Sequence, residues 1–246
     1  MPLKDHQDAF GHGIYDYFRG DDVDEVIERE DGYIDVSEGP KSYLSKYDEW
    51  PKHVQSAIKH AKGRVLDIGC GGGRHSLYLQ EKGLDVLGID NSPMALQCCE
   101  EQGLKKTKLM SITQITKKLG TFDTIIMMGN NFGLFANAKR CRMLLRRFHT
   151  MTSPDAYIIA ETMDVYQTQN NGHLEYQAWN RKRGRMSGQI RLRVRYLKYC
   201  TPWFDYLIVS KPELEELLVG TGWKVKKHLN GPRGMYTMIL EKEERK

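Results

Sequence analysis

The sequence predicts an α/β fold, in which a mostly parallel sheet is covered by helices and carries an N-terminal helical lid and a β insertion. From residue 64 to residue 160, short apolar runs alternate with segments of helical period, which is typical of βαβ units. The runs lack strict polar alternation, as expected of strands covered on both faces. This rhythm breaks at residues 164–206 and then resumes. With 246 residues, 40% of them hydrophobic, the chain can bury a sizeable core.

The expected elements follow in order along the chain. Residues 1–50 are acidic and aromatic, and they are expected to form the lid. Residues 51–163 and 207–246 are expected to form the core, whose first helix begins at Pro51, a residue that suits a first helical turn. Five strands are expected in the first part of the core: Val65–Ile68, Asp85–Ile89, Lys108–Met110, Thr124–Met127 and Tyr157–Ala160. Helices are expected between them over Ser76–Lys82, Ser92–Gln102, Ile112–Leu119 and Ala138–Met151.

Residues 164–206 are expected to form the insertion, with strands around Leu174–Trp179 and Gln189–Tyr199 and a basic turn between them. After the insertion, Ser210-Lys211-Pro212-Glu213 predicts the start of a helix that runs to Val219. Strands at Trp223–Leu229 and Met235–Glu241 then form a hairpin and complete the sheet.

Composition and charge exclude several classes of protein. The formal net charge of +5 is modest for a dedicated nucleic-acid binder. The apolar runs are too short to cross a bilayer, and the first residues show no apolar secretory block, so no membrane partner is expected. The five cysteines are scattered without C-x-x-C spacing, which indicates a reduced, cytoplasmic location. No cluster of His and Cys has the spacing of a metal site.

A glycine-rich turn is the most informative stretch of the chain. The strand that ends at Asp67 runs into glycines at 69, 71, 72 and 73 and then into a helix, so a ligand can approach the backbone and the amides of the helix N-terminus. The pattern lacks the Lys of a phosphate loop, and Arg74 stands where a dinucleotide fingerprint needs glycine. Asp67 suits an ammonium or sulfonium group better than a pyrophosphate. Asp90 ends the next strand, 21 positions after Gly69, where an acid can hold a ribose diol.

These motifs resemble those of the class I S-adenosylmethionine-dependent methyltransferases. Asp67-Ile68-Gly69-Cys70-Gly71-Gly72-Gly73 is similar to the first motif of that family, and Gly88-Ile89-Asp90 is similar to the second. The resemblance implies a Rossmann-like sheet of seven strands with the last strand antiparallel, and S-adenosylmethionine as cofactor. It implies a cofactor site of Asp67, Gly69 and Gly71 at the methionine part, Asp90 and Asn91 at the ribose, Met110 and Ser111 at the adenine, and Gly129 and Asn130 near the methyl group. The family often has an acidic residue where Ser111 stands.

Candidates for the acceptor site come from two segments. The fourth strand is followed by Gly129-Asn130-Asn131-Phe132, at the sheet edge where open α/β folds bind ligands. This sequence is similar to that of methyltransferases acting on small amines, such as the glycine and sarcosine enzymes, although a plain loop would also tolerate the two asparagines. Tyr17, with Tyr15 and Phe18, is expected to line the acceptor pocket or else to pack a helix. The catalytic candidates are therefore Tyr17, Asn130 and Asn131, while His12 and His173 are possible bases or surface residues.

The basic segment 181–198 leaves alternatives open. Its alternation places Arg191, Arg193 and Arg195 on one face of a strand. They could bind phosphates, or they could pair with acidic residues of the N-terminal segment, either within the chain or across a homodimer. The first hypothesis is thus a methyltransferase acting on a small-molecule amine or hydroxyl. The others are a methyltransferase acting on RNA, a cofactor-binding protein without turnover and, most distantly, a nicotinamide dehydrogenase.

Overall fold

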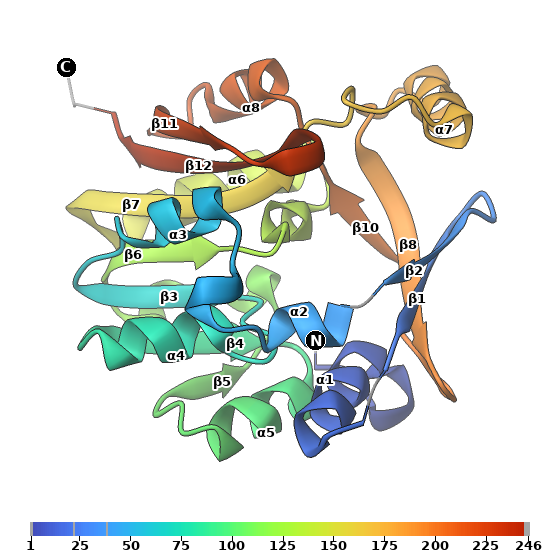
Figure 1. Ribbon diagram of the computed structural model, residues 1–246. Helices are drawn as coiled ribbons and strands as arrows, with labels where there is room; N and C mark the ends of the chain where they lie inside the picture. The colour runs from blue at the N-terminus through green and yellow to red at the C-terminus, as the bar shows by residue number, and fades with distance from the viewer. Residues whose placement is uncertain (1, 22, 38, 244–246) are drawn as a thin grey trace.

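The larger of two sheets fills one half of the molecule, and a smaller sheet stands across its edge (Figure 1). This computed structural model describes residues 2–21, 23–37 and 39–243. The larger sheet has the strand order β11-β12-β7-β6-β3-β4-β5. Its strands are β3 (Arg64–Ile68), β4 (Asp85–Asp90), β5 (Thr107–Leu109), β6 (Phe122–Met127), β7 (Thr152–Met163), β11 (Trp223–Asn230) and β12 (Met235–Lys242).

The directions of these strands confirm the predicted Rossmann-like sheet. Strands β3, β4, β5, β6 and β7 run parallel to one another, whereas β12 is antiparallel to both β7 and β11. Parallel strands bring all their carboxyl ends to one edge of a sheet, and it is at this edge that open α/β folds bind ligands.

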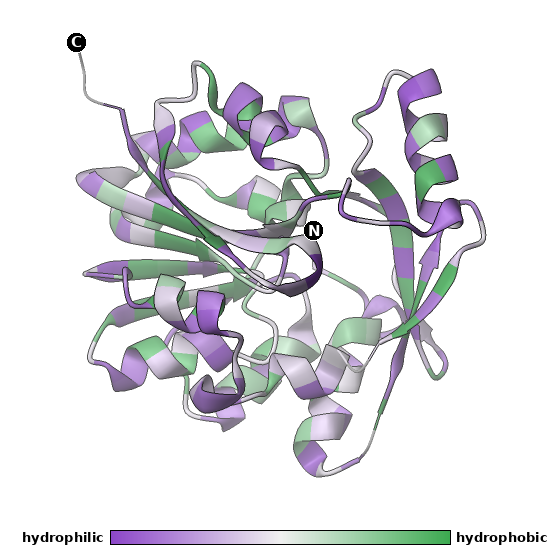
Figure 2. Cartoon of the chain, turned by 45° about the horizontal axis from the view of Figure 1, so that its top comes forward, coloured by the Kyte–Doolittle hydropathy of each residue, from purple (hydrophilic) through white to green (hydrophobic). Residues whose placement is uncertain are grey.

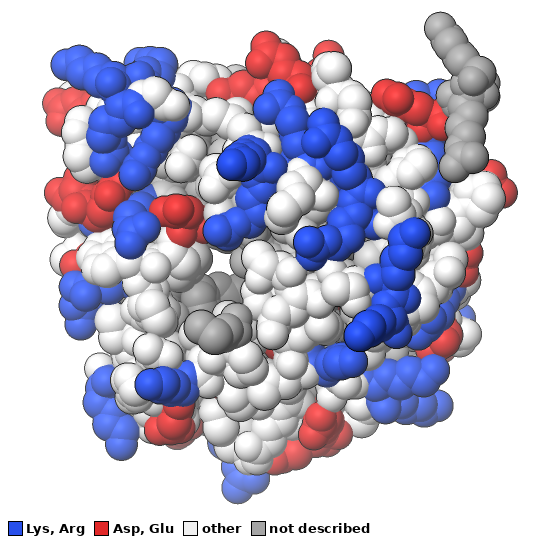
Figure 3. Space-filling view, turned by 180° about the vertical axis from the view of Figure 1, so that it is seen from behind, with Lys and Arg blue, Asp and Glu red and all other residues white. Residues whose placement is uncertain are grey.

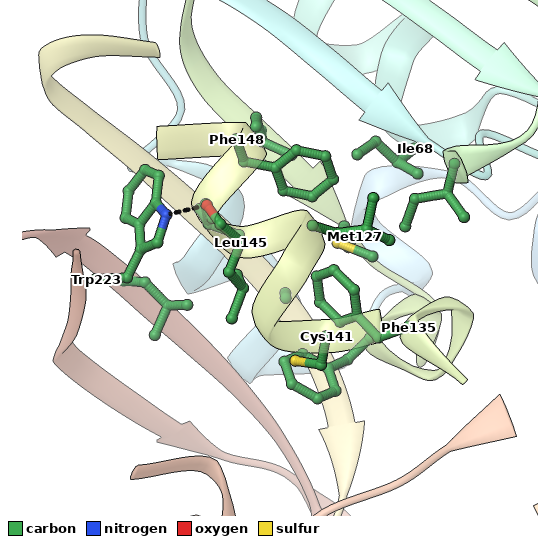
Figure 4. Packing of buried hydrophobic residues seen from close by; sticks show 14 of the residues in the cluster. Ile68, Met127, Phe135, Cys141, Leu145, Phe148 and Trp223 are labelled. Carbon is green, nitrogen blue, oxygen red and sulfur yellow. Dashed lines mark hydrogen bonds between the residues drawn. The ribbon is translucent and has the colours of Figure 1, made fainter. Parts of the chain in front are cut away.

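Helices bury both faces of the larger sheet. They are α3 (Lys52–Ile58), α4 (Arg74–Glu81), α5 (Pro93–Glu101), α6 (Ala138–Thr150) and α8 (Lys211–Leu218). Alternate strand residues point to opposite faces, so that Ile125 packs with residues of α6 and α8 while Ile126 packs with residues of α3 and α4. Figure 4 shows the first of these clusters, in which Trp223 donates a hydrogen bond of 3.0 Å from Nε1 to the carbonyl of Leu145.

The smaller sheet joins the N-terminal segment to the insertion. Its strands are β1 (Glu25–Arg29), β2 (Ile34–Ser37), β8 (Gln189–Tyr196), β9 (Tyr199–Cys200) and β10 (Phe204–Leu207). The order is β10-β8-β1-β2, with β9 paired to β8, and all pairs are antiparallel. In Figure 2 the long strand of this sheet alternates between hydrophobic and hydrophilic residues, whereas the central strands of the larger sheet are largely hydrophobic.

The N-terminal segment is helical only in part. Its helical elements are η1 (Asp5–Gln7), α1 (Ala9–Arg19), α2 (Gly39–Tyr43) and η2 (Tyr47–Glu49). Strands β1 and β2, which the sequence analysis did not predict, lie between α1 and α2. The segment therefore supplies both a covering helix and two of the five strands of the smaller sheet.

Two predicted elements differ in the structure. The expected strand at Leu174–Trp179 is wrong, because these residues lie within helix α7 (Asn171–Lys182). The side chain of Asn170 caps this helix. Its buried residues, Tyr176, Gln177 and Asn180, have helical spacing. The hydrophobic residues at every second position from Leu174 instead suggest a strand. The expected helix over Ile112–Leu119 is two 3-10 turns, η3 (Ile112–Gln114) and η4 (Lys117–Leu119), because the backbone is extended at Ile115 and Thr116.

Two further 3-10 turns complete the chain, η5 (Asn131–Phe135) after β6 and η6 (Pro232–Gly234) in the final hairpin. Among the described residues, no helix is both long and apolar enough to traverse a lipid bilayer.

Candidate functional site

Asp67 is the last residue but one of β3, directly before the glycine-rich turn. Its side chain is buried, with 2% of the residue exposed, and Oδ2 accepts a hydrogen bond of 2.7 Å from Ser76 Oγ. Burial raises the pKa of this carboxyl to about 7, and the nearby charge of Asp90 acts in the same direction while Ser76 opposes the shift. A buried carboxylate with so few hydrogen bonds is stabilised when a cation binds beside it.

Asp90 lies at the end of β4, next to the same turn. Its Oδ2 accepts a hydrogen bond from the amide of Gly71 and its Oδ1 one from the amide of Ser92, both at 3.0 Å. Burial raises the pKa of Asp90 as well. Because a carboxylate has about four acceptor positions, each oxygen can still accept a hydroxyl, as the expected role at a ribose requires.

Asn131 joins the loop after β6 to the glycine-rich turn. Its Nδ2 donates to the carbonyls of Gly69, at 2.7 Å, and Ile68, at 3.2 Å. Gly69 has a φ of 73°, and a Cβ at this position would lie 2.7 Å from Asn131 Nδ2. The structure thus brings Gly69 and Asn131 together, and it gives Asn131 a positioning contact with the turn.

A third acid, Glu161 at the carboxyl end of β7, completes this edge. It is 3% exposed, and its Oε1 lies 2.8 Å from Nε2 of the buried His53. Its Oε2 accepts hydrogen bonds from the amides of Gly129, at 2.7 Å, and Asn130, at 3.3 Å. Glu161 was not predicted from the sequence, although it lies near the carboxyl end of a buried strand, as Asp67 and Asp90 do.

Arg74 and Tyr206 close the site from the sides. Arg74 Nη1 donates to the carbonyl of Ser42 at 2.7 Å and to Ser45 Oγ at 3.0 Å, and its Nη2 lies 3.6 Å from where a Cβ on Gly129 would stand. The Tyr206 hydroxyl, from β10, donates to the carbonyl of Asn130 at 2.5 Å. Both the N-terminal segment and the insertion therefore reach the loop after β6.

The residues expected at the adenine lie on the far side of Asp90. The amide of Met110 donates to the carbonyl of Asp90 at 2.8 Å. Ser111 caps η3, and both side chains are half-buried. The carbonyl of Asn91 accepts a hydrogen bond of 2.8 Å from the amide of Leu3, so the N-terminal segment crosses this part of the site.

Helix α1 covers the glycine-rich turn. Ile14 packs with Ala95 and Cys98 of α5, and its Cδ1 lies 3.8 Å from where a Cβ on Gly71 would stand. Asp8 fixes the helix, because its Oδ1 accepts a hydrogen bond from the amide of Gly11 and its Oδ2 one from the amide of Met94 in α5. A single buried carboxylate therefore caps α1 and ties it to α5.

We expect Asp8→Ala to lower the free energy of unfolding by about 1–2 kcal/mol, since it removes a helix cap, and to weaken cofactor binding because α1 loses its tie. Asn170→Ala is the control, because Asn170 caps α7 of the insertion with its side chain, a helix that is separate from the glycine-rich turn (Figure 1). Urea unfolding and calorimetric titration with S-adenosylhomocysteine compare the two variants. Equal affinity in both variants would contradict a covering role for α1.

The other candidates lie outside this cluster. Tyr17 is half-buried on α1, and no side-chain hydrogen bond of Tyr17 is found in the described part of the chain. His12 stacks on Tyr199 with ring centroids 3.6 Å apart. His173 lies on α7, against the ring of Tyr33. Each of the two histidines therefore packs on an aromatic ring.

The arginines of β8 face acids of the same chain. Glu28 accepts hydrogen bonds from Arg193 and Arg195, at 2.8 and 2.9 Å, and Asp205 accepts one from Arg191 at 3.2 Å. The two arginine contacts lower the pKa of Glu28 to about 2. The two pairs with Glu28 match the expectation that the basic strand pairs with the acidic N-terminal segment within the chain, whereas Asp205 belongs to the insertion itself.

A second group of cations lies on α6. Figure 3 shows Lys and Arg side chains gathered on the back of the molecule, the side on which α6 lies in Figure 1. Arg142 and Arg146 donate to the carbonyls of Glu216 and Gly220, and Arg147 donates to those of Thr113 and Ile115. These three arginines therefore bind helix ends and turns of the chain itself.

Comparison with curated proteins agrees with the motifs. Residues 65–155 match the family model of a methyltransferase domain. A glycine/sarcosine N-methyltransferase from Halorhodospira halochloris is 29% identical over 152 residues, which cover 59% of this chain and 54% of the relative. An enzyme of the same name from Aphanothece halophytica is 25% identical over 152 residues, with coverages of 59% and 55%. The chain thus spans about half the length of these curated relatives.

A solved structure matches the whole chain. A SAM-dependent methyltransferase from Bacteroides fragilis, in complex with S-adenosyl-L-homocysteine, has a TM-score of 0.84 over 99% of this chain and 98% of its own, at 23% identity. At this identity the similarity is one of fold. It extends beyond the larger sheet to the N-terminal segment and the smaller sheet.

Proposed function

We propose that this chain, which belongs to the class I S-adenosylmethionine-dependent methyltransferases, transfers a methyl group to a small-molecule acceptor bound between its two sheets. S-adenosylmethionine is the methyl donor of this family. The acceptor and the roles of individual residues are inferred from the arrangement of the site.

The two acids at the glycine-rich turn are the observation that carries the proposal. Asp67 is buried and Asp90 is half-buried, both at the glycine-rich turn, and desolvation raises the pKa of both. A site with two such carboxylates suits a ligand with a cationic amino-acid tail and a ribose diol. Gly71 has no side chain, so a ligand can approach the backbone of the turn closely, while its amide holds Asp90 in place.

The residues of the chain then have distinct tasks. Asp67 would bind the ammonium group, Asp90 and Asn91 the ribose, and Met110 and Ser111 the adenine. When bound, S-adenosylmethionine supplies a methyl carbon on a sulfonium, whose C–S bond breaks as the bond to the acceptor forms. Alignment and exclusion of water are the main tasks left to the protein, and we assign these tasks to Asn130, Asn131 and the covering helix with Tyr17.

The similarity to enzymes named glycine/sarcosine N-methyltransferases supports a small acceptor. The RNA alternative receives less support, because Arg191, Arg193 and Arg195 already pair with Asp205 and Glu28. A homodimer and a cytoplasmic location remain expectations from the sequence.

Two measurements test the proposal. Calorimetry should show saturable binding of S-adenosylmethionine, and incubation with that donor and a panel of small amines and alcohols should release S-adenosylhomocysteine. Binding without product from any acceptor would instead favour a cofactor-binding protein without turnover. Saturable binding of NAD with no heat from S-adenosylmethionine would overturn the assignment altogether.

A further inference from the structure

Glu25 is a buried acid that the cofactor site does not use. It begins β1 in the smaller sheet and is 1% exposed. Its Oε1 accepts a hydrogen bond of 2.8 Å from the hydroxyl of Tyr43. Within the described residues, its buried Oε2 has no hydrogen-bond partner, although Ser37 lies opposite it on β2. A buried carboxylate oxygen without a partner is costly unless a ligand completes it.

The surroundings of Glu25 lead from the smaller sheet to the reacting end of the cofactor site. Tyr43, its partner, lies on α2 between the two sheets (Figure 1). Aromatic rings continue from there: Phe10 lies 6.4 Å from both Tyr43 and Phe204, and Phe204 lies 6.3 Å from Tyr206, measured between ring centroids. Tyr206 in turn donates to the carbonyl of Asn130. An acid and four aromatic rings thus border one region beside the loop after β6.

We propose that Glu25 Oε2 binds the nitrogen of the methyl acceptor, and that the acceptor is a small aliphatic amine. This inference rests on the proposed function and names its substrate class.

The charge and the rings favour an amine over a hydroxyl compound. A carboxylate accepts N–H hydrogen bonds and attracts a cation, and aromatic faces attract a positively charged nitrogen. The nitrogen reacts as the free amine, and its lone pair forms the N–C bond as the C–S bond of the donor breaks. The product nitrogen is then an ammonium, whose charge the carboxylate stabilises until its extra proton passes to water. Burial raises the pKa of Glu25 to about 7, although the hydrogen bond from Tyr43 and a weaker polar contact of Ser37 oppose the shift, as expected of an acid that has no counter-ion among the described residues.

Arg74 also borders this region, because its charge acts on the hydroxyl of Tyr43. Its guanidinium donates hydrogen bonds to Ser42 and Ser45, which precede and follow Tyr43 in the N-terminal segment. An acceptor with a carboxylate at its other end could bind between Glu25 and Arg74. Glycine and sarcosine have this pattern of charges, and they are therefore the first probes.

The test measures turnover of S-adenosylmethionine with glycine, sarcosine, ethanolamine and dimethylamine, and with the hydroxyl analogues glycolate and ethylene glycol. We expect product from at least one amine and none from the hydroxyl compounds. Glu25→Gln should raise the KM of that amine about tenfold or more, with a smaller change in kcat and unchanged affinity for S-adenosylhomocysteine. Tyr43→Phe, which leaves the carboxylate in place, should raise KM less.

Glu28→Gln is the matched control, because it removes the same charge from the same strand, at a residue paired with Arg193 and Arg195. It should leave the KM of the amine unchanged. Thermal melting identifies a variant that fails to fold, and Tyr43→Phe then provides the comparison. An unchanged KM in Glu25→Gln, product only from hydroxyl compounds, or no product from any of these amines would overturn this inference. Failure to bind S-adenosylmethionine would instead overturn the proposed function.

Discussion

Asp67→Asn is expected to weaken the binding of S-adenosylmethionine about thirtyfold or more and, at the same time, to stabilise the ligand-free protein. Binding weakens because the amide removes the charge that would pair with the ammonium group in a buried site. Stability rises because an acid with a folded pKa of about 7, above its unfolded value, destabilises the folded state once it is ionised. Asparagine can still accept the hydrogen bond from Ser76, so we expect a gain of about 1–3 kcal/mol at pH 8.

Calorimetry and urea unfolding at pH 8 measure the two effects. Asp85→Asn is the control, since Asp85 begins β4 at the opposite edge and has a half-exposed side chain, and it should leave the affinity unchanged. The pH dependence adds a second measurement: below pH 7 Asp67 must lose a proton to bind a cation, so the affinity at pH 6 should be about tenfold lower than at pH 8. Asp67→Asn should remove most of this dependence. A variant that binds as tightly as the wild type would show that Asp67 does not face the ligand.

The larger sheet could be predicted because its signals are local. The central strands β3 and β6 are runs of mostly apolar residues buried on both faces, and the glycines after Asp67 mark one particular turn. Asp90 could be recognised by its place at the end of a strand. Glu161 has the same signal in Ile158-Ile159-Ala160-Glu161, and the three acids meet because parallel strands end at one edge.

The smaller sheet could not be predicted in the same way. Its pairing joins β1 to β8, more than 150 positions apart, as in the pair of Ile27 with Val194, and no local pattern specifies such a partner. The charges give an indirect signal, since the arginines of β8 find Glu28 across this pairing. Glu25 has no such signal in the sequence, because it is one of many acids in an acidic segment. Only its burial and its unpartnered oxygen in the structure distinguish it.

Glu161→Ala is expected to lower the free energy of unfolding by about 3–5 kcal/mol, because it breaks a buried pair and leaves His53 without its partner. The amides of Gly129 and Asn130 lose their acceptor at the same time. Both residues have a positive φ, 68° at Gly129 and 65° at Asn130, and for Asn130 this backbone conformation is costly without support from neighbouring groups. We therefore expect faster hydrogen exchange at these two amides and weaker binding of S-adenosylhomocysteine.

Glu241→Ala is the control, because it breaks a surface ion pair of the same sheet. It therefore shows how much stability is lost when an ordinary ion pair is removed. Glu241 lies on the neighbouring strand β12 and pairs with Lys226 at 2.9 Å, but at the surface, where such pairs contribute at most about 1 kcal/mol. If both variants lose the same small amount of stability, Glu161 does not hold the loop. If Glu161→Ala alone is strongly destabilised, the acid at the end of β7 positions Asn130 between the cofactor turn and Tyr206. The reacting end of the site would then depend on a residue that is expected to touch neither the cofactor nor the acceptor.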